Sequence, residues 1–179
     1  MLKVLALSGS LRRQSYNTCA LEAIRELAAA NVSITLGDVG SLPLFNPDLE
    51  DSGIASVDIL KAQLAEASGL IIASPEYAHG ISGPMKNALD WLVSGVEFPG
   101  MPIMLINTSP RATHAQASLR EVLTTMSGSI VEEASVAIPL LGSELDSNGI
   151  LRDKQPKELL QRGLNSFVES MKASSRIPT

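Results

Sequence analysis

The stretch SGSLRRQSYN, Ser8 to Asn17, gathers hydroxyl, amide and guanidinium groups between an apolar run and a helical pattern. α/β proteins place phosphate loops there, yet this one matches neither G-x-G-x-x-G nor G-x-x-x-x-G-K-[ST]. Arginine can hold two phosphate oxygens, hydroxyl groups can satisfy the others without Mg²⁺, and the following helix directs free N–H groups to the same place. The stretch therefore predicts a site for a terminal phosphate monoester. The alternative is that Ser15 or Asn17 merely caps the helix.

A second loop, SPEYAHGISGP from Ser74 to Pro84, is rich in residues that shape the backbone. A flat heterocycle can lie against Pro75 and Tyr77 while the exposed backbone presents N–H groups to its polar edge. The alternative is an ordinary connection between a strand and a helix. A third loop, NTSPRATHAQ, adds the polar side chains of Ser109 and Arg111.

The elements that position these loops follow from five apolar runs: Lys3–Leu7, Val32–Leu36, Gly69–Ser74, Pro102–Asn107 and Ser135–Ile138. Most are too continuously apolar for a strand with one wet face, so they predict a parallel sheet covered on both sides. Segments with helical spacing lie between them, which is typical of a doubly wound α/β domain with right-handed crossovers. Ligands bind such sheets at the carboxyl ends of the strands, where we expect the three loops to meet.

Composition narrows the class of protein. A chain of 179 residues fits one domain, and a formal net charge of −5 without long charged runs gives no footprint for nucleic acid or membrane surfaces. No apolar stretch approaches the roughly 20 residues of a membrane span. The single cysteine, Cys19, excludes an internal disulfide. We expect a cytoplasmic protein with one domain over residues 1–172 and a flexible tail over 173–179.

Four segments, GSLRRQSYN, LPLFNPDLED, SPEYAHGISGPMKNALDWL and SNGILRD, together resemble the NADPH-dependent FMN reductase family of flavodoxin-like quinone, chromate and azo-dye reductases. The resemblance covers nearly the whole chain and implies a five-stranded parallel sheet of order 2-1-3-4-5 with helices on both faces. The residues that it implies for the FMN phosphate are Ser10, Arg12, Ser15 and Asn17. Those that it implies beside the isoalloxazine ring are Pro75, Glu76, Tyr77 and Ala78, with Ser109 as a further polar contact.

The chain departs from the family pattern at three places. Ala78 stands where similar proteins often have asparagine, Gly80 stands where they have serine, and the third loop lacks their paired glycines. Backbone contacts to the ring survive the first two changes. Arg13 remains open, as either a second phosphate ligand or a solvated neighbour.

The resemblance implies an FMN-dependent oxidoreductase that takes electrons from NADPH or NADH and passes them to a small acceptor such as a quinone, free flavin, azo compound or chromate. FMN carries the chemistry, so no catalytic side chain is needed. Cys19 has no partner cysteine, and His79 and His114 are isolated, which argues against a redox thiol and a metal site. His79 either lines the substrate opening or is solvated.

Trp91 lies away from the apolar stripe of its predicted helix, on the side of Lys86, Asn87 and Asp90. We interpret it as a subunit contact in a homodimer or homotetramer, the assemblies that family members form. The alternative is packing under the loop around Phe98. Two rival functions also remain: a flavodoxin-like electron carrier or flavin sensor without steady turnover, and a binding protein for another phosphorylated metabolite. The arginine-bearing loop and the aromatic content of 3% favour the enzyme over a flavodoxin.

Overall fold

A parallel sheet forms the centre of the computed structural model, which describes residues 1–174. Its strands lie in the order β2-β1-β3-β6-β7, with β8 also paired to β6. With β7 and β8 taken as one fifth strand, this is the predicted order 2-1-3-4-5. The strands are β1 (Leu2–Ser8), β2 (Val32–Gly37), β3 (Gly69–Ala73), β6 (Pro102–Asn107), β7 (Ser129–Ile130) and β8 (Val136–Ala137).

The fifth strand is interrupted. β7 pairs with the start of β6 and β8 with its end, through the registers Pro102↔Ser129 and Ile106↔Val136. Ser135 bridges the gap, because its Oγ accepts a hydrogen bond from the backbone N–H of Leu105 at 3.2 Å. The predicted run at 135–138 therefore corresponds to β8 alone, and the two residues of β7 are too few to show a periodic pattern.

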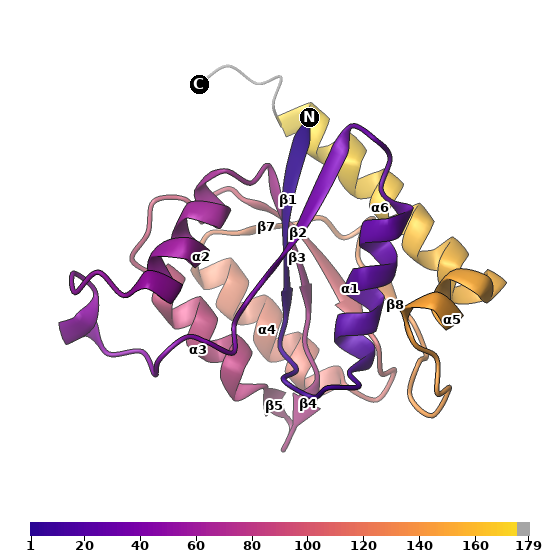
Figure 1. The fold of residues 1–179 in the computed structure, drawn as a ribbon, viewed down its shortest axis with the longest axis horizontal. Helices are drawn as coiled ribbons and strands as arrows, with labels where there is room; N and C mark the ends of the chain where they lie inside the picture. Colours follow the sequence, from indigo (N-terminus) through magenta and orange to yellow (C-terminus); the bar gives the residue numbers. More distant parts are fainter. Residues whose placement is uncertain (175–179) are drawn as a thin grey trace.

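Helices cover both faces of the sheet (Figure 1). One layer consists of α1 (Tyr16–Leu27), α5 (Ser147–Arg152) and α6 (Lys154–Ser174), and the other of α2 (Ala55–Ala65), α3 (Gly83–Leu92) and α4 (Thr113–Thr125). In β1, Val4 and Ala6 join the core under the first layer while Leu5 and Leu7 join the core under the second. This two-sided burial explains why the strand runs are continuously apolar.

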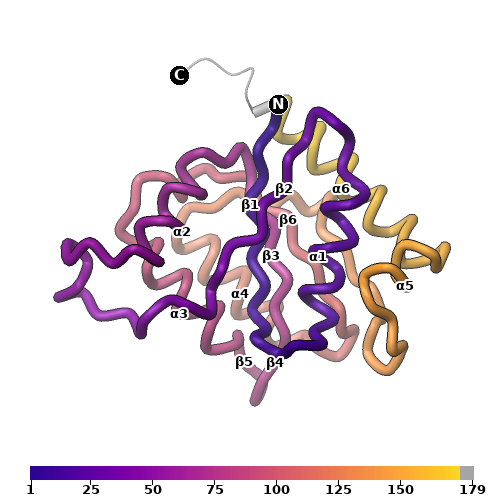
Figure 2. Tube along the Cα trace, in the orientation of Figure 1, coloured from indigo at the N-terminus to yellow at the C-terminus, as the bar shows by residue number. Residues whose placement is uncertain are grey.

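The first and second predicted loops lie side by side at one edge of the sheet (Figure 2). Ser82 Oγ donates a hydrogen bond of 2.6 Å to the carbonyl of Gly9. A Cβ atom at Gly9 would lie 2.5 Å from Ser74 Oγ, so only glycine permits this approach. A short 3₁₀ turn, η1 (Pro47–Leu49), lies in the connection between β2 and α2.

The prediction that Trp91 forms a subunit contact is wrong. Its side chain has no exposed surface, its Nε1 donates a hydrogen bond of 2.8 Å to the carbonyl of Pro43, and its ring meets that of Phe45 edge-on at 5.1 Å. Asn87 fastens the same segment by donating to the Pro43 carbonyl and accepting from the Phe45 N–H. The side of α3 that carries Trp91 is thus covered by the connection after β2. Trp91 therefore packs within its own chain, as the alternative predicts, but under the segment around Pro43 and Phe45. Phe98 is buried in the same core.

The carboxyl-terminal helix α6 continues to Ser174, two residues beyond the predicted domain boundary. The rest of the predicted tail, residues 175–179, lies outside the described residues. None of the helices within 1–174 combines the length and the apolar character needed to cross a membrane.

Candidate functional site

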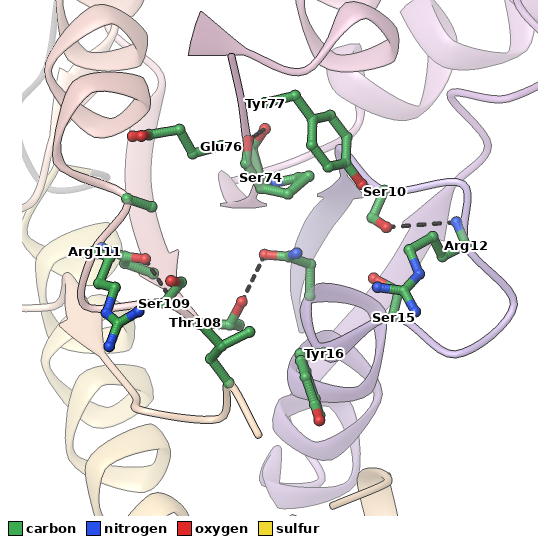
Figure 3. A pocket seen from close by; sticks show the side chains of 15 residues that line it. Ser10, Arg12, Ser15, Tyr16, Ser74, Glu76, Tyr77, Thr108, Ser109 and Arg111 are labelled. Carbon is green, nitrogen blue, oxygen red and sulfur yellow. Dashed lines mark hydrogen bonds between the residues drawn. The ribbon is translucent and has the colours of Figure 1, made fainter. Parts of the chain in front are cut away.

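A pocket of about 290 Å³ lies at the carboxyl ends of β1, β3 and β6. Eight of the nine predicted cofactor ligands line it: Ser10, Arg12, Ser15, Asn17, Pro75, Glu76, Tyr77 and Ser109. Figure 3 shows Ser10, Arg12 and Ser15 on one side and Ser109 and Arg111 on the other, with Tyr77 between them at the upper edge. The ninth, Ala78, does not line this pocket and is exposed at the tip of a hairpin.

The first wall of the pocket is the loop before α1. Ser15 is the N-cap of α1, and its buried Oγ accepts from the backbone N–H of Thr18 at 3.3 Å. Ser10 Oγ, also buried, accepts from the Arg12 N–H at 3.4 Å. Ser15 therefore performs the capping that the alternative proposed, and it also borders the pocket. The two roles are compatible, because an N-cap hydroxyl lies beside the free N–H groups that favour an anion.

The charge of the pocket favours an anionic ligand. Arg12 and Arg111 both line it with exposed side chains, and neither forms an ion pair with any residue in the described part of the chain. Glu76 is the one carboxylate among the lining residues, and its Oε2 accepts from the backbone N–H of Ala115. Free guanidinium groups, hydroxyls and a helix N-terminus are the donors that a phosphate monoester needs. The residues present therefore fit an FMN phosphate.

Arg13 does not line this pocket. It lines an adjacent cavity with Cys19, Glu144 and Asp146, and Arg12 and Ser15 border that cavity as well. Burial raises the pKa of the Cys19 thiol, and the carboxylates of Glu22 and Asp146 raise it further. A protonated thiol is a poor nucleophile, in keeping with the prediction that Cys19 has no redox role.

The loop after β6 forms another wall of the pocket. Thr108 is buried, and its Oγ1 donates a hydrogen bond of 3.1 Å to Asn17 Oδ1 (Figure 3). The backbone N–H of Ser109 donates to Asn107 Oδ1 at 3.0 Å. Sequence reasoning missed six further lining residues: Tyr16, Ser74, Asn107, Thr108, Ala112 and Leu141. The first five have a signal, since they lie in the three predicted loops, but Leu141 follows β8 and its apolar side chain gives none.

The hairpin of β4 (Glu76–Tyr77) and β5 (Gly80–Ile81) forms the remaining wall of the pocket. Its two turn residues, Ala78 and His79, have φ values of 49° and 59°. Positive φ at both positions is the geometry of a tight hairpin turn that favours asparagine and glycine. His79 stacks on His114, with ring centroids 4.4 Å apart and planes inclined by 9°. Within residues 1–174 no group of three potential metal-binding side chains occurs.

Residues 2–141 match the sequence profile of NADPH-dependent FMN reductases. The chain belongs to this family. An NAD(P)H-dependent FMN reductase of Pseudomonas aeruginosa is 33% identical over 172 residues, which cover 93% of each chain. A 2-hydroxy-1,4-benzoquinone reductase of a Burkholderia species is 31% identical over 93% of this chain and 94% of its own. The solved flavoenzyme NAD(P)H:(acceptor) oxidoreductase FerB of Paracoccus denitrificans superposes with a TM-score of 0.86 at 27% identity, covering 97% of this chain and 98% of its own.

Family membership confirms several predictions at once. The fold is flavodoxin-like, the cofactor is FMN, and NAD(P)H is the electron donor of an oxidoreductase. The electron-carrier alternative is not favoured, because the relatives named above are reductases with a nicotinamide donor or a quinone acceptor.

Proposed function

We propose that this NAD(P)H-dependent oxidoreductase delivers electrons to small quinones. The observation that supports the proposal is the pocket itself, whose donors at one end suit a phosphate and whose other walls, at Pro75 and Tyr77, suit a flat ring. Tyr77 is 50% exposed, so the ring-binding part of the site opens to solvent on the side of the hairpin. An open face of this kind admits a planar acceptor. The Burkholderia relative carries a benzoquinone in its name.

In this proposal the phosphate end of the pocket is formed by Ser10, Arg12, Ser15 and Asn17, and the ring is bordered by Pro75, Glu76, Tyr77, Ala78 and Ser109. Bound FMN supplies the hydride and electron transfer. The protein orients it: the guanidinium of Arg12 neutralises the phosphate, and Thr108 holds Asn17 in place through its hydrogen bond. Ala78 contributes only its backbone.

The purified protein tests this function directly. With FMN and NADPH or NADH, we expect many turnovers of a benzoquinone for each molecule of enzyme, measured anaerobically from the loss of nicotinamide absorbance. The flavin absorption bands should bleach when the nicotinamide is added alone and return when the quinone follows. A protein that binds FMN but stops after one reduction would contradict the enzyme and support a carrier or sensor.

We also propose that the protein is a cytoplasmic homodimer or homotetramer, with a subunit contact other than Trp91. We assign the contact to four exposed apolar residues, Leu44 and Leu49 in the connection after β2 and Val93 and Val96 just beyond α3, and call them the apolar patch. Ser94 Oγ joins the two segments by donating to Glu50 Oε1 at 2.7 Å. Leu44 is 84% exposed and Val96 is 87% exposed, values that favour a partner surface over solvent.

Charge placed in this patch should dissociate the assembly. We expect Val96→Glu to lower the molar mass measured by light scattering at micromolar concentration to that of one chain, because a buried unpaired carboxylate is unfavourable at an interface. Ala30→Glu, at an exposed turn before β2, is the control and should leave the mass unchanged. A wild-type protein of monomeric mass would contradict the assembly itself.

A further inference from the structure

Helix α4 begins without a capping side chain of its own. The residue at its N-cap is Ala112, which has no side-chain acceptor, so the first N–H groups of the helix depend on other partners. One of them is satisfied from a distant part of the chain. Glu76 Oε2 accepts the backbone N–H of Ala115 at 2.8 Å, across 39 positions in sequence. A carboxylate is well suited to this place, because the N-terminus of a helix carries partial positive charge.

A second contact joins the same two elements. His114 lies in the first turn of α4, next to Ala115, and stacks on His79 at the tip of the hairpin. His79 and Ala78 keep positive φ values although neither is glycine. Such backbone geometry is unfavourable for these residues and persists where surrounding contacts hold it. The carboxylate of Glu76 and the imidazole stack thus fasten β4 and the turn of the hairpin to one helix terminus.

The two fastened elements are neighbouring walls of the pocket. The hairpin brings Tyr77, and the loop that leads into α4 brings Ser109 and Arg111 (Figure 3). We propose that Glu76 is a positioning residue whose carboxylate caps α4 in trans and so fixes the hairpin wall relative to the neighbouring wall before α4, the two walls that border the flavin ring. This inference rests on the proposed FMN site and adds to it the contact that holds these two walls in place. Because its Oε2 is engaged by Ala115, Glu76 acts through the backbone of α4.

The cap is tested without any flavin, by hydrogen exchange of the Ala115 amide in NMR spectra. We expect Glu76→Ala to speed this exchange by about five- to tenfold, the effect of losing a typical cap. Glu76→Gln should stay within about twofold of the wild type, because its amide oxygen still accepts a hydrogen bond. Glu132→Ala is the matched control. It also removes a carboxylate that contacts α4, but this carboxylate pairs with Arg120 in the middle of the helix and not with its first turn. Unchanged Ala115 exchange in Glu76→Ala would overturn the cap.

The effect on the site is tested with two flavins, by fluorescence titration with FMN and with riboflavin. Glu76→Ala should weaken both by the same factor, about tenfold, since ring placement is common to the two ligands. The visible spectrum of the bound flavin should change, and Glu76→Gln should restore both affinity and spectrum. The positioning role would be refuted if Glu76→Ala weakened FMN but not riboflavin. It would also be refuted if Glu76→Ala exchanged the Ala115 amide faster and still bound both flavins as tightly as the wild type. A wild-type protein that binds neither flavin would overturn the proposed function and the flavin part of this inference, while Ala115 exchange alone decides the cap.

Discussion

Replacing Arg12 by alanine is expected to weaken FMN binding by about 10- to 100-fold while riboflavin binding changes by less than about twofold. The reason is that the Arg12 side chain borders the pocket, has no ion-pair partner in residues 1–174, and is free to meet a phosphate. Riboflavin lacks the phosphate and gains nothing from this charge. The measurement is the ratio of the two dissociation constants, taken from the quenching of flavin fluorescence.

The chain supplies a matched control for this experiment. Arg13 is the adjacent arginine and is also exposed, but it does not line the candidate pocket; it lines the neighbouring cavity with Glu144 and Asp146, which Arg12 borders too. Arg13→Ala should leave the FMN-to-riboflavin ratio close to that of the wild type. Ser15→Ala is less diagnostic, because Ser15 also caps α1 and its loss would disturb the helix along with the site. Equal weakening of both flavins by Arg12→Ala would remove Arg12 from the phosphate site.

The phosphate loop shows what could be predicted from sequence. Ser10, Arg12, Ser15 and Asn17 lie on one continuous segment, and the apolar run before it identifies the end of a buried strand. The parallel topology then brings the loops after β1, β3 and β6 to one edge of the sheet. Eight of the nine predicted residues line one pocket because local pattern and topology together were sufficient to place them there, and their role as ligands stays a prediction.

The features that the sequence did not predict share a physical cause: they depend on contacts between segments far apart in the chain. Helical spacing gave the angle of Trp91 around α3, but it could not show that the chain around Pro43 covers that side. The bond from Glu76 to Ala115 joins segments that no local pattern relates. Each of these features is decided by what the folded chain brings together.

Truncating Trp91 is expected to cost more stability than any other change considered for this protein. Trp91→Ala should lower the free energy of unfolding by about 3–5 kcal/mol, because it removes a fully buried aromatic side chain and leaves a cavity. The Pro43 carbonyl loses the indole donor, although it keeps the hydrogen bond from Asn87. The free energy is measured by urea denaturation followed by far-ultraviolet circular dichroism, since the variant lacks the only tryptophan of the chain.

Two further variants separate packing from assembly. Trp91→Phe retains most of the ring volume beside Phe45 and should lose only about 1–3 kcal/mol, from the smaller ring and the missing Nε1 donor together. Ile59→Ala, on the exposed side of α2 and outside the proposed subunit contact, should change the free energy by less than about 0.5 kcal/mol. If Trp91 instead contacted another subunit, Trp91→Ala would lower the molar mass of the assembly while leaving the stability of the single chain nearly intact. The buried indole beneath Pro43 and Phe45 leads us to expect the reverse, a large loss of stability that originates within one chain.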